Sequence, residues 1–316
     1  MSQRHAAIRR AVTPLPGSQS RDHFKPINIP GNCDALPLLA ALRQMVGNVS
    51  AAEWLAEFAL NRVVNLEQKP AVATQIVRAG ERYQHLFPNV TEPAVNGDVK
   101  ILHEDEALIV VDKPAPLPMH AGGRFYLNTL QHILNTAYQP QTPFPAHRLD
   151  ANTTGLILAA RTRFFAAKLQ GQFAQGRVEK TYRARVNGQL PADEFYCAAP
   201  ISADAGEHCS RTIDLANGLA ARTDFCVLHR YPDGTSLLEA RPLTGRTNQI
   251  RVHLWHLGLP VCGDTIYLPD KKIGRNQTLG VGDPPLCLHA SRVKFLHPLN
   301  SEPVEFTAPL PIWATS

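Results

Sequence analysis

The sequence predicts an α+β protein whose larger part is built on a mixed, largely antiparallel sheet with flanking helices. From about residue 100 onward, short apolar runs of strand type are separated by Gly and Pro, and few segments carry helical spacing. The Tyr-Pro-Asp-Gly turn at 231–234 joins the apolar runs 225–228 and 237–240. This pattern is typical of a hairpin, so we expect neighbouring strands to pair antiparallel.

The first 30 residues predict a basic, flexible arm. They hold one acid, Asp22, and no apolar core of the kind that a secretory signal needs. Prolines interrupt any long amphipathic helix in this stretch. The basic residues of the arm are Arg4, Arg9, Arg10, Arg21 and Lys25.

Residues 31–98 predict a small mixed module. Apolar residues at helical spacing over 38–45 follow Pro37, which suits a first helical turn. Ser50 and Glu53 form a capping box that opens a second helix.

Residues 99–316 predict the main domain, in which strands alternate with a few helices. Gly258 is suited to end the last of these helices. In chain order we expect a helix at 129–138, a strand at 155–160, a helix at 164–173, a strand at 182–186, a helix at 250–257 and a flexible surface insertion at 268–283.

Composition describes an ordinary globular protein of 316 residues, with 44% hydrophobic and 19% charged residues. No apolar run is long enough to span a membrane. The net charge of +5 is compatible with a polyanionic partner without requiring one. Scattered cysteines without a CxxC pair predict reduced thiols and a cytoplasmic protein. The six are Cys33, Cys197, Cys209, Cys226, Cys262 and Cys287.

The most informative segment is 147–158, His-Arg-Leu-Asp-Ala-Asn-Thr-Thr-Gly-Leu-Ile-Leu. It places Asp150 just ahead of the apolar run 155–160, so a strand would hold the carboxylate at the end of a rigid element. Arg148, two positions earlier, projects to the same side if the chain is locally extended. The ordinary alternative is a loop aspartate that is ion-paired with this arginine.

Three other segments decide between these alternatives. Together with 147–158 they resemble, in order, the motifs of RluA-type pseudouridine synthases: "ED-x-x-hydrophobic-x-KP", "HRLD-x-x-T-S-G-L", "K-x-Y-x-A" and "TGRTHQIRVH". The sequence departs from the pattern with Thr154 for Ser, Asn248 for His and Pro116 for a common Gly. The three further segments are 101–114, 179–184 and 241–253.

The resemblance implies a pseudouridine synthase fold and the isomerisation of uridine in structured RNA. It implies Asp150 as the nucleophile, Arg251 as the cation that keeps it ionised, and Tyr182 as the ring that stacks on the target base. It places Arg148 in the gap left by the extruded base. Contacts to substrate are further expected from His147, which we interpret as more structural than catalytic, from Lys113 and from Arg246.

The reaction needs no metal or other cofactor, because it involves neither redox chemistry nor hydrolysis. Five residues could suggest zinc, but their spacing matches no common ligand pattern. They are His253, His256, Cys262, Cys287 and His289.

Two rival functions remain at the level of sequence. One is an RNA-binding protein that has lost catalysis on the same fold, against which the retention of Asp150, Tyr182 and Arg251 argues. The other is an Asp-nucleophile hydrolase, which would need a second placed carboxylate.

The choice of RNA depends on other segments. Residues 120–130 resemble relatives that act on the tRNA anticodon stem-loop more than those dedicated to large-subunit rRNA, which is the alternative. By its position, the 31–98 module resembles the S4-like RNA-binding module of some relatives, although a degenerate or unrelated module fits equally well. We expect RNA as the partner, no membrane association and a monomer.

Overall fold

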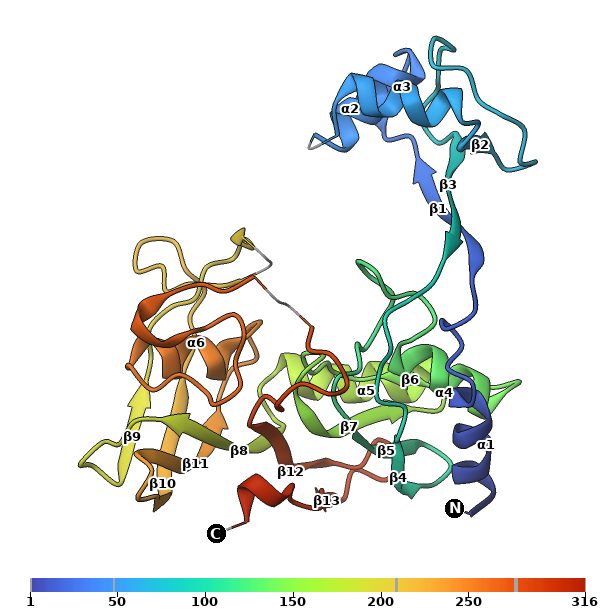
Figure 1. The fold of residues 1–316 in the computed structure, drawn as a ribbon. Helices are drawn as coiled ribbons and strands as arrows, with labels where there is room; N and C mark the ends of the chain where they lie inside the picture. Colours follow the sequence, from blue (N-terminus) through green and yellow to red (C-terminus); the bar gives the residue numbers. More distant parts are fainter. Residues whose placement is uncertain (1, 48, 208–209, 276–277, 316) are drawn as a thin grey trace. The chain divides into compact units, whose positions relative to one another are not determined.

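The computed structural model describes residues 2–47, 49–207, 210–275 and 278–315. The chain divides into two compact units (Figure 1). The larger contains residues 1–18 and 92–316, and the smaller contains residues 19–91.

The larger unit is built on one ten-stranded sheet. Its main path runs β4-β5-β7-β12-β8-β11-β10-β9, with β13 beside β12 and β6 beside β7. Only β7 and β12 pair parallel, and every other described pair is antiparallel. The predicted fold class is confirmed. The strands are β4 Lys100–Glu104, β5 Leu108–Lys113, β6 Phe144–Pro145, β7 Thr154–Ala160, β8 Glu179–Asn187, β9 Glu194–Cys197, β10 Thr223–Arg230, β11 Thr235–Pro242, β12 Leu288–Leu296 and β13 Pro303–Thr307.

Both faces of the strands around β7 are buried. Ile157 packs with α4 (Leu130–Tyr138) on one face, and Leu156 and Leu158 pack with α5 (Arg163–Ala174) on the other. This explains why 155–160 is continuously apolar rather than alternating. The segment that follows Asp150 is therefore a rigid element in the centre of the domain.

The other half of the sheet is covered by α6 (Gln249–His256). Its Ile250 and Leu254 pack with Phe225, Leu238 and Ala240 of the β10–β11 hairpin. The helix is one residue displaced from the predicted span, and Gly258 follows it with a φ of 80°. Near 268–283 the structure has a 3-10 turn η3 (Pro269–Lys271) and a bridge between Tyr267 and Ile273, while residues 276 and 277 of the expected insertion lie outside the described residues.

The N-terminal segment differs from the flexible arm that we expected at 1–30. Residues Ser2–Val12 form helix α1, which packs on α4 and buries Ile8 to 2% exposure. The guanidinium of Arg4 lies 4.5 Å from the centre of the Tyr138 ring. The helix ends before Pro14, so the prolines limit its length without preventing it.

The smaller unit also differs from the expected boundaries of 31–98. It begins at residue 19 because β1 (Arg21–Asn28) pairs with β3 (Arg82–Val90), about 60 residues later in the chain. The other elements are η1 (Gly31–Cys33), α2 (Leu38–Met45), α3 (Ala51–Ala59) and β2 (Val63–Asn65).

Its three-stranded antiparallel sheet has the order β1-β3-β2. The capping box of Ser50 and Glu53 is present with both of its hydrogen bonds. In the part of the chain that the structure covers, no helix is both long and apolar enough to cross a membrane.

Candidate active site

Asp150 lies in the loop that enters β7. The loop turns tightly after it, with the N–H of Thr153 donating to the carbonyl of Asp150 at 3.1 Å. A quarter of the Asp150 side chain is exposed. The carboxylate is thus accessible, while the backbone beneath it is fixed.

Lys113 hydrogen-bonds to the backbone of this loop. Its side chain is completely buried, and Nζ donates to the carbonyl oxygens of Pro114, Leu117 and Ala151 at 2.9–3.1 Å. Burial lowers the pKa of Lys113 to about 7, against the opposing effect of Asp150. We expected this lysine among the substrate-binding residues. The structure instead gives it no exposed surface, and its side chain donates to three backbone carbonyls, of which one belongs to Ala151, the residue after Asp150.

Arg251 of α6 lies against Asp150. Its Nη1 donates to Oδ2 of Asp150 at 3.0 Å, although the arginine itself is only 5% exposed. Nε and Nη2 donate to the two carboxylate oxygens of Asp264 at 2.7 and 2.8 Å. Such a bidentate pair fixes the plane of the guanidinium, so its remaining nitrogen has a defined direction toward Asp150.

Asp264 was not among the predicted site residues. Its side chain is fully buried, and its Oδ1 also accepts from the backbone N–H groups of Ile266 and Tyr267. The bonds from Asp264 raise the pKa of Arg251 although burial alone would lower it. The sequence gives only a weak indication of this role, because Asp264 is an acidic residue after a glycine and lies 13 residues beyond Arg251.

Tyr182 of β8 packs against two of the hydrophobic clusters of the larger unit, the one that contains Ile157 and the one that contains Ile250. Burial raises the pKa of its hydroxyl, and the negative charge of Asp150 raises it further. The tyrosine is therefore neutral and can present a ring face or a hydroxyl beside Asp150.

Asp150, Arg251 and Tyr182 line one cleft of about 660 Å³. The structure brings together every predicted site residue except Lys113 along its walls. From the predicted set, the cleft is lined by His147, Arg148, Asp150, Tyr182, Arg246 and Arg251.

His147 has a structural environment within this wall. Its Nε2 accepts from the N–H of Leu158 at 3.1 Å, and its ring stacks on Phe173 at 4.6 Å. Burial lowers the pKa of His147 to about 3, with the charge of Lys180 as a second cause. The hydrogen bond and the stacking contact link the ring of His147 to β7 and α5, and its role toward substrate stays a prediction.

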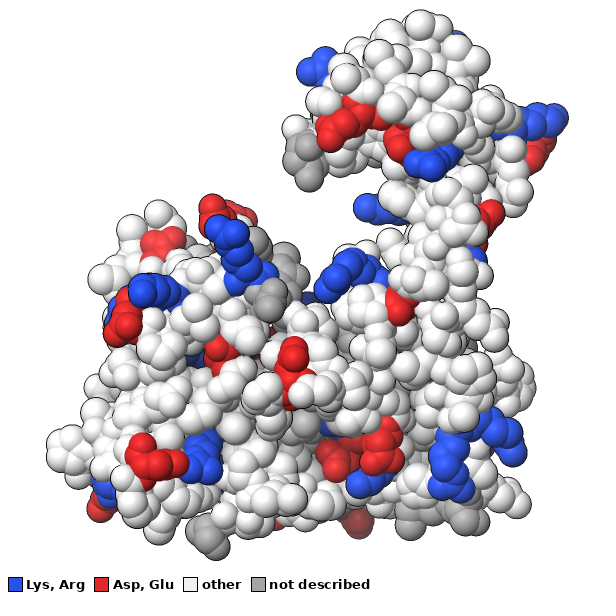
Figure 2. Space-filling view, in the orientation of Figure 1, with Lys and Arg blue, Asp and Glu red and all other residues white. Residues whose placement is uncertain are grey.

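The cationic rim of the cleft is less constrained. Arg148 is exposed, and its guanidinium has no hydrogen bond or ion pair with any residue in the described ranges. Arg246 is exposed and holds the carbonyl of Ala220 through Nε at 3.0 Å. On the face shown in Figure 2, Lys and Arg lie scattered among Asp and Glu.

A partly exposed carboxylate held by a buried guanidinium, beside a neutral tyrosine, is an arrangement suited to nucleophilic catalysis. The family model for RNA pseudouridylate synthases matches residues 107–256, which contain all three groups. The ribosomal large subunit pseudouridine synthase D of Nitrosomonas europaea is 33% identical over 306 residues, covering 93% of this chain and 87% of that protein. This chain belongs to the RluA-type pseudouridine synthase family. It is accordingly an isomerase that acts on RNA.

Other relatives cover the chain differently. The dual-specificity RNA pseudouridine synthase RluA of Pasteurella multocida is 32% identical over 69% of this chain and 95% of its own length. Human pseudouridylate synthase RPUSD2 is 36% identical over 65% of this chain, which spans only 37% of that protein. The solved structure of human RNA pseudouridylate synthase domain containing 1 matches 67% of this chain and 84% of its own with a TM-score of 0.54 and 26% identity.

Two of the departures from the family motifs have a clear structural place. Thr154, which replaces Ser, shares a hydrogen bond of 2.8 Å between its hydroxyl and Nδ1 of the buried His289. Asn248, which replaces His, precedes α6 in the left-handed region with a φ of 58°. Asn adopts this conformation more readily than most residues.

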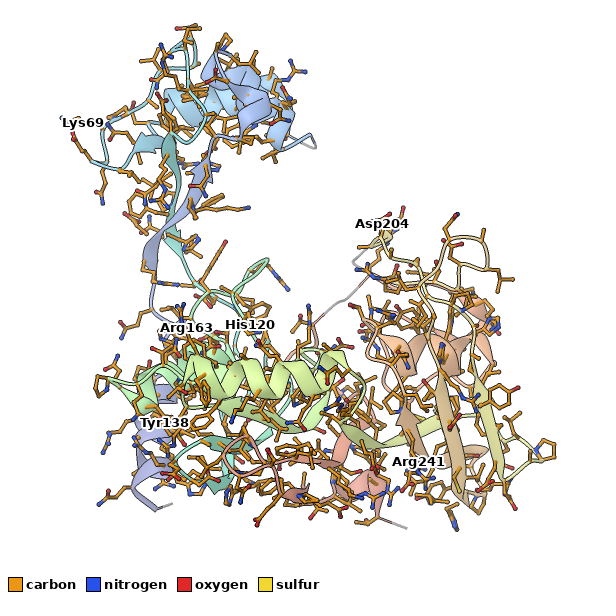
Figure 3. All side chains as sticks on the ribbon, turned by 180° about the vertical axis from the view of Figure 1, so that it is seen from behind. Lys69, His120, Tyr138, Arg163, Asp204 and Arg241 are labelled. Atoms are coloured by element: carbon orange, nitrogen blue, oxygen red, sulfur yellow. The ribbon has the colours of Figure 1, made fainter. Side chains whose placement is uncertain are left out.

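The loop ahead of α4 contains His120. Figure 3 marks His120 in this loop, and the pKa of His120 is lowered by burial and, second, by the charge of Arg148. His120 is thus the residue of this loop on which the charge of Arg148 acts.

Glu92 anchors the same loop. Its carboxylate accepts from the N–H groups of Tyr126, Leu127 and Asn128 at 2.8–3.0 Å. The side chain of Asn128 in turn accepts from the N–H of Gly17 at 2.8 Å. Sequence reasoning missed Glu92, since its partners lie more than 30 residues away.

No group of three His, Cys, Asp or Glu that could hold a metal ion exists among the residues that the structure covers. One residue of the suspected zinc set, His253, is fully occupied in the core. Its two ring nitrogens hydrogen-bond to Thr223 Oγ1 and to the carbonyl of Ala199, both at 3.0 Å.

Proposed function

We propose that this enzyme converts uridine to pseudouridine in structured RNA, with Asp150 as the nucleophile. The contact between Nη1 of Arg251 and Oδ2 of Asp150 carries the proposal. A base that covers Asp150 would exclude water and disfavour the charged carboxylate. The buried arginine offsets this effect, because its charge is permanent and Asp264 holds it in place.

The reaction breaks the bond between C1′ and N1, turns the base and joins C1′ to C5. The proton on C5 is lost and N1 gains one, so the product is an isomer. Asp150 can act by attack on the sugar, by attack on the base or by promoting elimination to a glycal, and each route begins from the ionised carboxylate. Tyr182 supplies a ring face for the base in the same cleft.

Arg148 is proposed to hold the RNA open. Extruding a base costs a few kcal/mol, least where the base already lies in a loop. The guanidinium of Arg148, which is exposed and has no partner within the described ranges, can stack or hydrogen-bond in the vacated space.

As substrate we propose the tRNA anticodon stem-loop. Support comes from the motif in 120–130 and from the position of this loop near Arg148. The tRNA pseudouridine(32) synthase of Saccharomyces cerevisiae mitochondria is 31% identical over 70% of this chain.

Large-subunit rRNA is the second candidate. The relative from Nitrosomonas europaea, which is named for the ribosomal large subunit, matches 93% of this chain. A match of this extent takes in at least part of the 19–91 unit.

The test is direct modification by the purified full chain. Transcripts of an anticodon stem-loop and of large-subunit rRNA helices are incubated with the protein, and pseudouridines are mapped by carbodiimide-blocked primer extension. We expect a stop at a uridine of the anticodon stem-loop and none when cytidine replaces that uridine. Stops confined to rRNA would overturn the substrate choice, and no stop in either RNA would contradict the proposed activity on both substrates.

A further inference from the structure

Asn248 occupies a position at which its backbone and its side chain are both constrained. It is the N-cap residue of α6, with φ 58° and ψ 15°. Its side chain does not cap the helix. The side-chain amide instead hydrogen-bonds to Arg251 and Tyr267.

Two hydrogen bonds fix the orientation of this amide. Oδ1 of Asn248 accepts from Nη1 of Arg251 at 3.1 Å, and Nδ2 donates to the hydroxyl oxygen of Tyr267 at 3.1 Å. Tyr267 is itself held by the backbone of Arg211, donating to its carbonyl and accepting from its N–H. The opposite flip would point an NH₂ group at the guanidinium, so only one orientation satisfies both partners.

The nitrogen that Asn248 holds is the same one that holds Asp150. Nη1 carries two hydrogens, and its two acceptors are Asp150 Oδ2 at 3.0 Å and Asn248 Oδ1 at 3.1 Å. Asp264 accepts from the other two nitrogens. Apart from Asp150, each nitrogen of the guanidinium thus has one further acceptor: Asp264 for Nε and Nη2, and Asn248 for Nη1.

The proposed reaction changes the charge of one acceptor of Nη1, Asp150, but not that of the other, Asn248. If Asp150 attacks the sugar, one of its oxygens bonds to C1′ while the bond from C1′ to N1 breaks and its electron pair leaves with the base. The carboxylate then becomes a neutral ester and accepts more weakly. The amide oxygen of Asn248 keeps the same charge throughout.

We propose that Asn248 is a positioning residue that keeps Nη1 of Arg251 in place while the charge of Asp150 changes. This inference rests on the proposed role of Asp150. A residue that acts in this way affects the chemical step more than RNA binding.

Asn248→Gly tests the inference, because glycine keeps the left-handed backbone without strain and removes only the amide. Loss of a hydrogen bond to a charged group predicts a fall in kcat of about tenfold or more. KM for the RNA should stay close to wild type, whereas the Tm should fall, because Arg251 and Tyr267 each lose a hydrogen-bond partner. Ser301→Gly is the matched control, since Ser301 is exposed in the same unit and has a φ of 61°.

Asn248→Asp adds a readout that a merely structural role would not move. Aspartate keeps an acceptor for Arg251 but places a second carboxylate beside Asp150. Two adjacent carboxylates resist being ionised together. We therefore expect the loss of activity on acidification to begin at a higher pH than in the wild type.

The outcomes separate this inference from the proposed function. An active wild type with an Asn248→Gly variant of unchanged kcat would overturn the role of Asn248 alone. The same conclusion would follow if Asn248→Asp had the wild-type pH profile. A wild type without activity on any RNA would overturn both proposals.

Discussion

The two arginines of the cleft, Arg251 and Arg148, are held in opposite ways. Arg251 is buried and makes ion pairs with Asp150 and Asp264. Arg148 is exposed, and its guanidinium is free of partners among the described residues. In the proposed mechanism this difference corresponds to a division of labour, in which the arginine assigned to the chemistry is held by ion pairs and the arginine assigned to RNA is not.

The largest effect is expected at the fixed arginine. Arg251→Met leaves Asp264 buried without a cation, and breaking a buried ion pair costs about 3–5 kcal/mol. We expect a lower free energy of unfolding in urea denaturation and no detectable pseudouridine. The double variant Arg251→Met with Asp264→Asn should recover stability but not activity. Recovered activity in that double variant would contradict the role of Arg251.

A second prediction concerns Lys113, beneath Asp150. The pKa of Lys113 is about 7 in the folded protein and about 10.4 when unfolded. Between these values the unfolded chain binds a proton that the folded chain does not, so stability rises with pH by about 1.4 kcal/mol per unit.

Lys113→Met removes this dependence. Urea denaturation from pH 7 to 10 should therefore show the wild type gaining stability relative to the variant as the pH rises. Parallel curves for the two proteins would show that the ammonium group keeps its ordinary pKa.

The smallest effect is expected at the free arginine. Arg148→Ala should leave the free energy of unfolding within about 0.5 kcal/mol of wild type. Loss of a stacking partner for nucleic acid predicts a decrease in kcat/KM of about tenfold. Arg148→Lys separates charge from planarity, because lysine keeps the phosphate attraction but cannot stack in the same way. A large loss of stability in Arg148→Ala would contradict the claim that Arg148, unlike Arg251, does not stabilise the fold.

Much of the larger unit was predictable because its signals are local. The apolar run of β7, the helical spacing of α4 and α5, and the turn of the β10–β11 hairpin each lie within a short stretch of sequence. The catalytic motifs also lie next to the elements that carry them. The structure accordingly brings Asp150, Tyr182 and Arg251 into one cleft.

The unpredicted features depend on distant partners. The carboxylate of Glu92 accepts hydrogen bonds from backbone N–H groups at 126–128. Strand β1 pairs with β3, which lies at the other end of the smaller unit in sequence. Helix α1 is stabilised by burying Ile8 against α4 rather than by a pattern of its own. The S4-like character of the 19–91 unit stays a prediction.

The central claim, that Asp150 performs the covalent chemistry, is tested most directly by Asp150→Asn in single-turnover assays with excess enzyme. The substitution keeps the shape of the side chain and an acceptor for Arg251 but removes the charge. We predict unchanged RNA affinity and a Tm close to wild type, with no pseudouridine formed on the time scale of the wild-type reaction. Pseudouridine formation by Asp150→Asn at the wild-type rate would contradict the account.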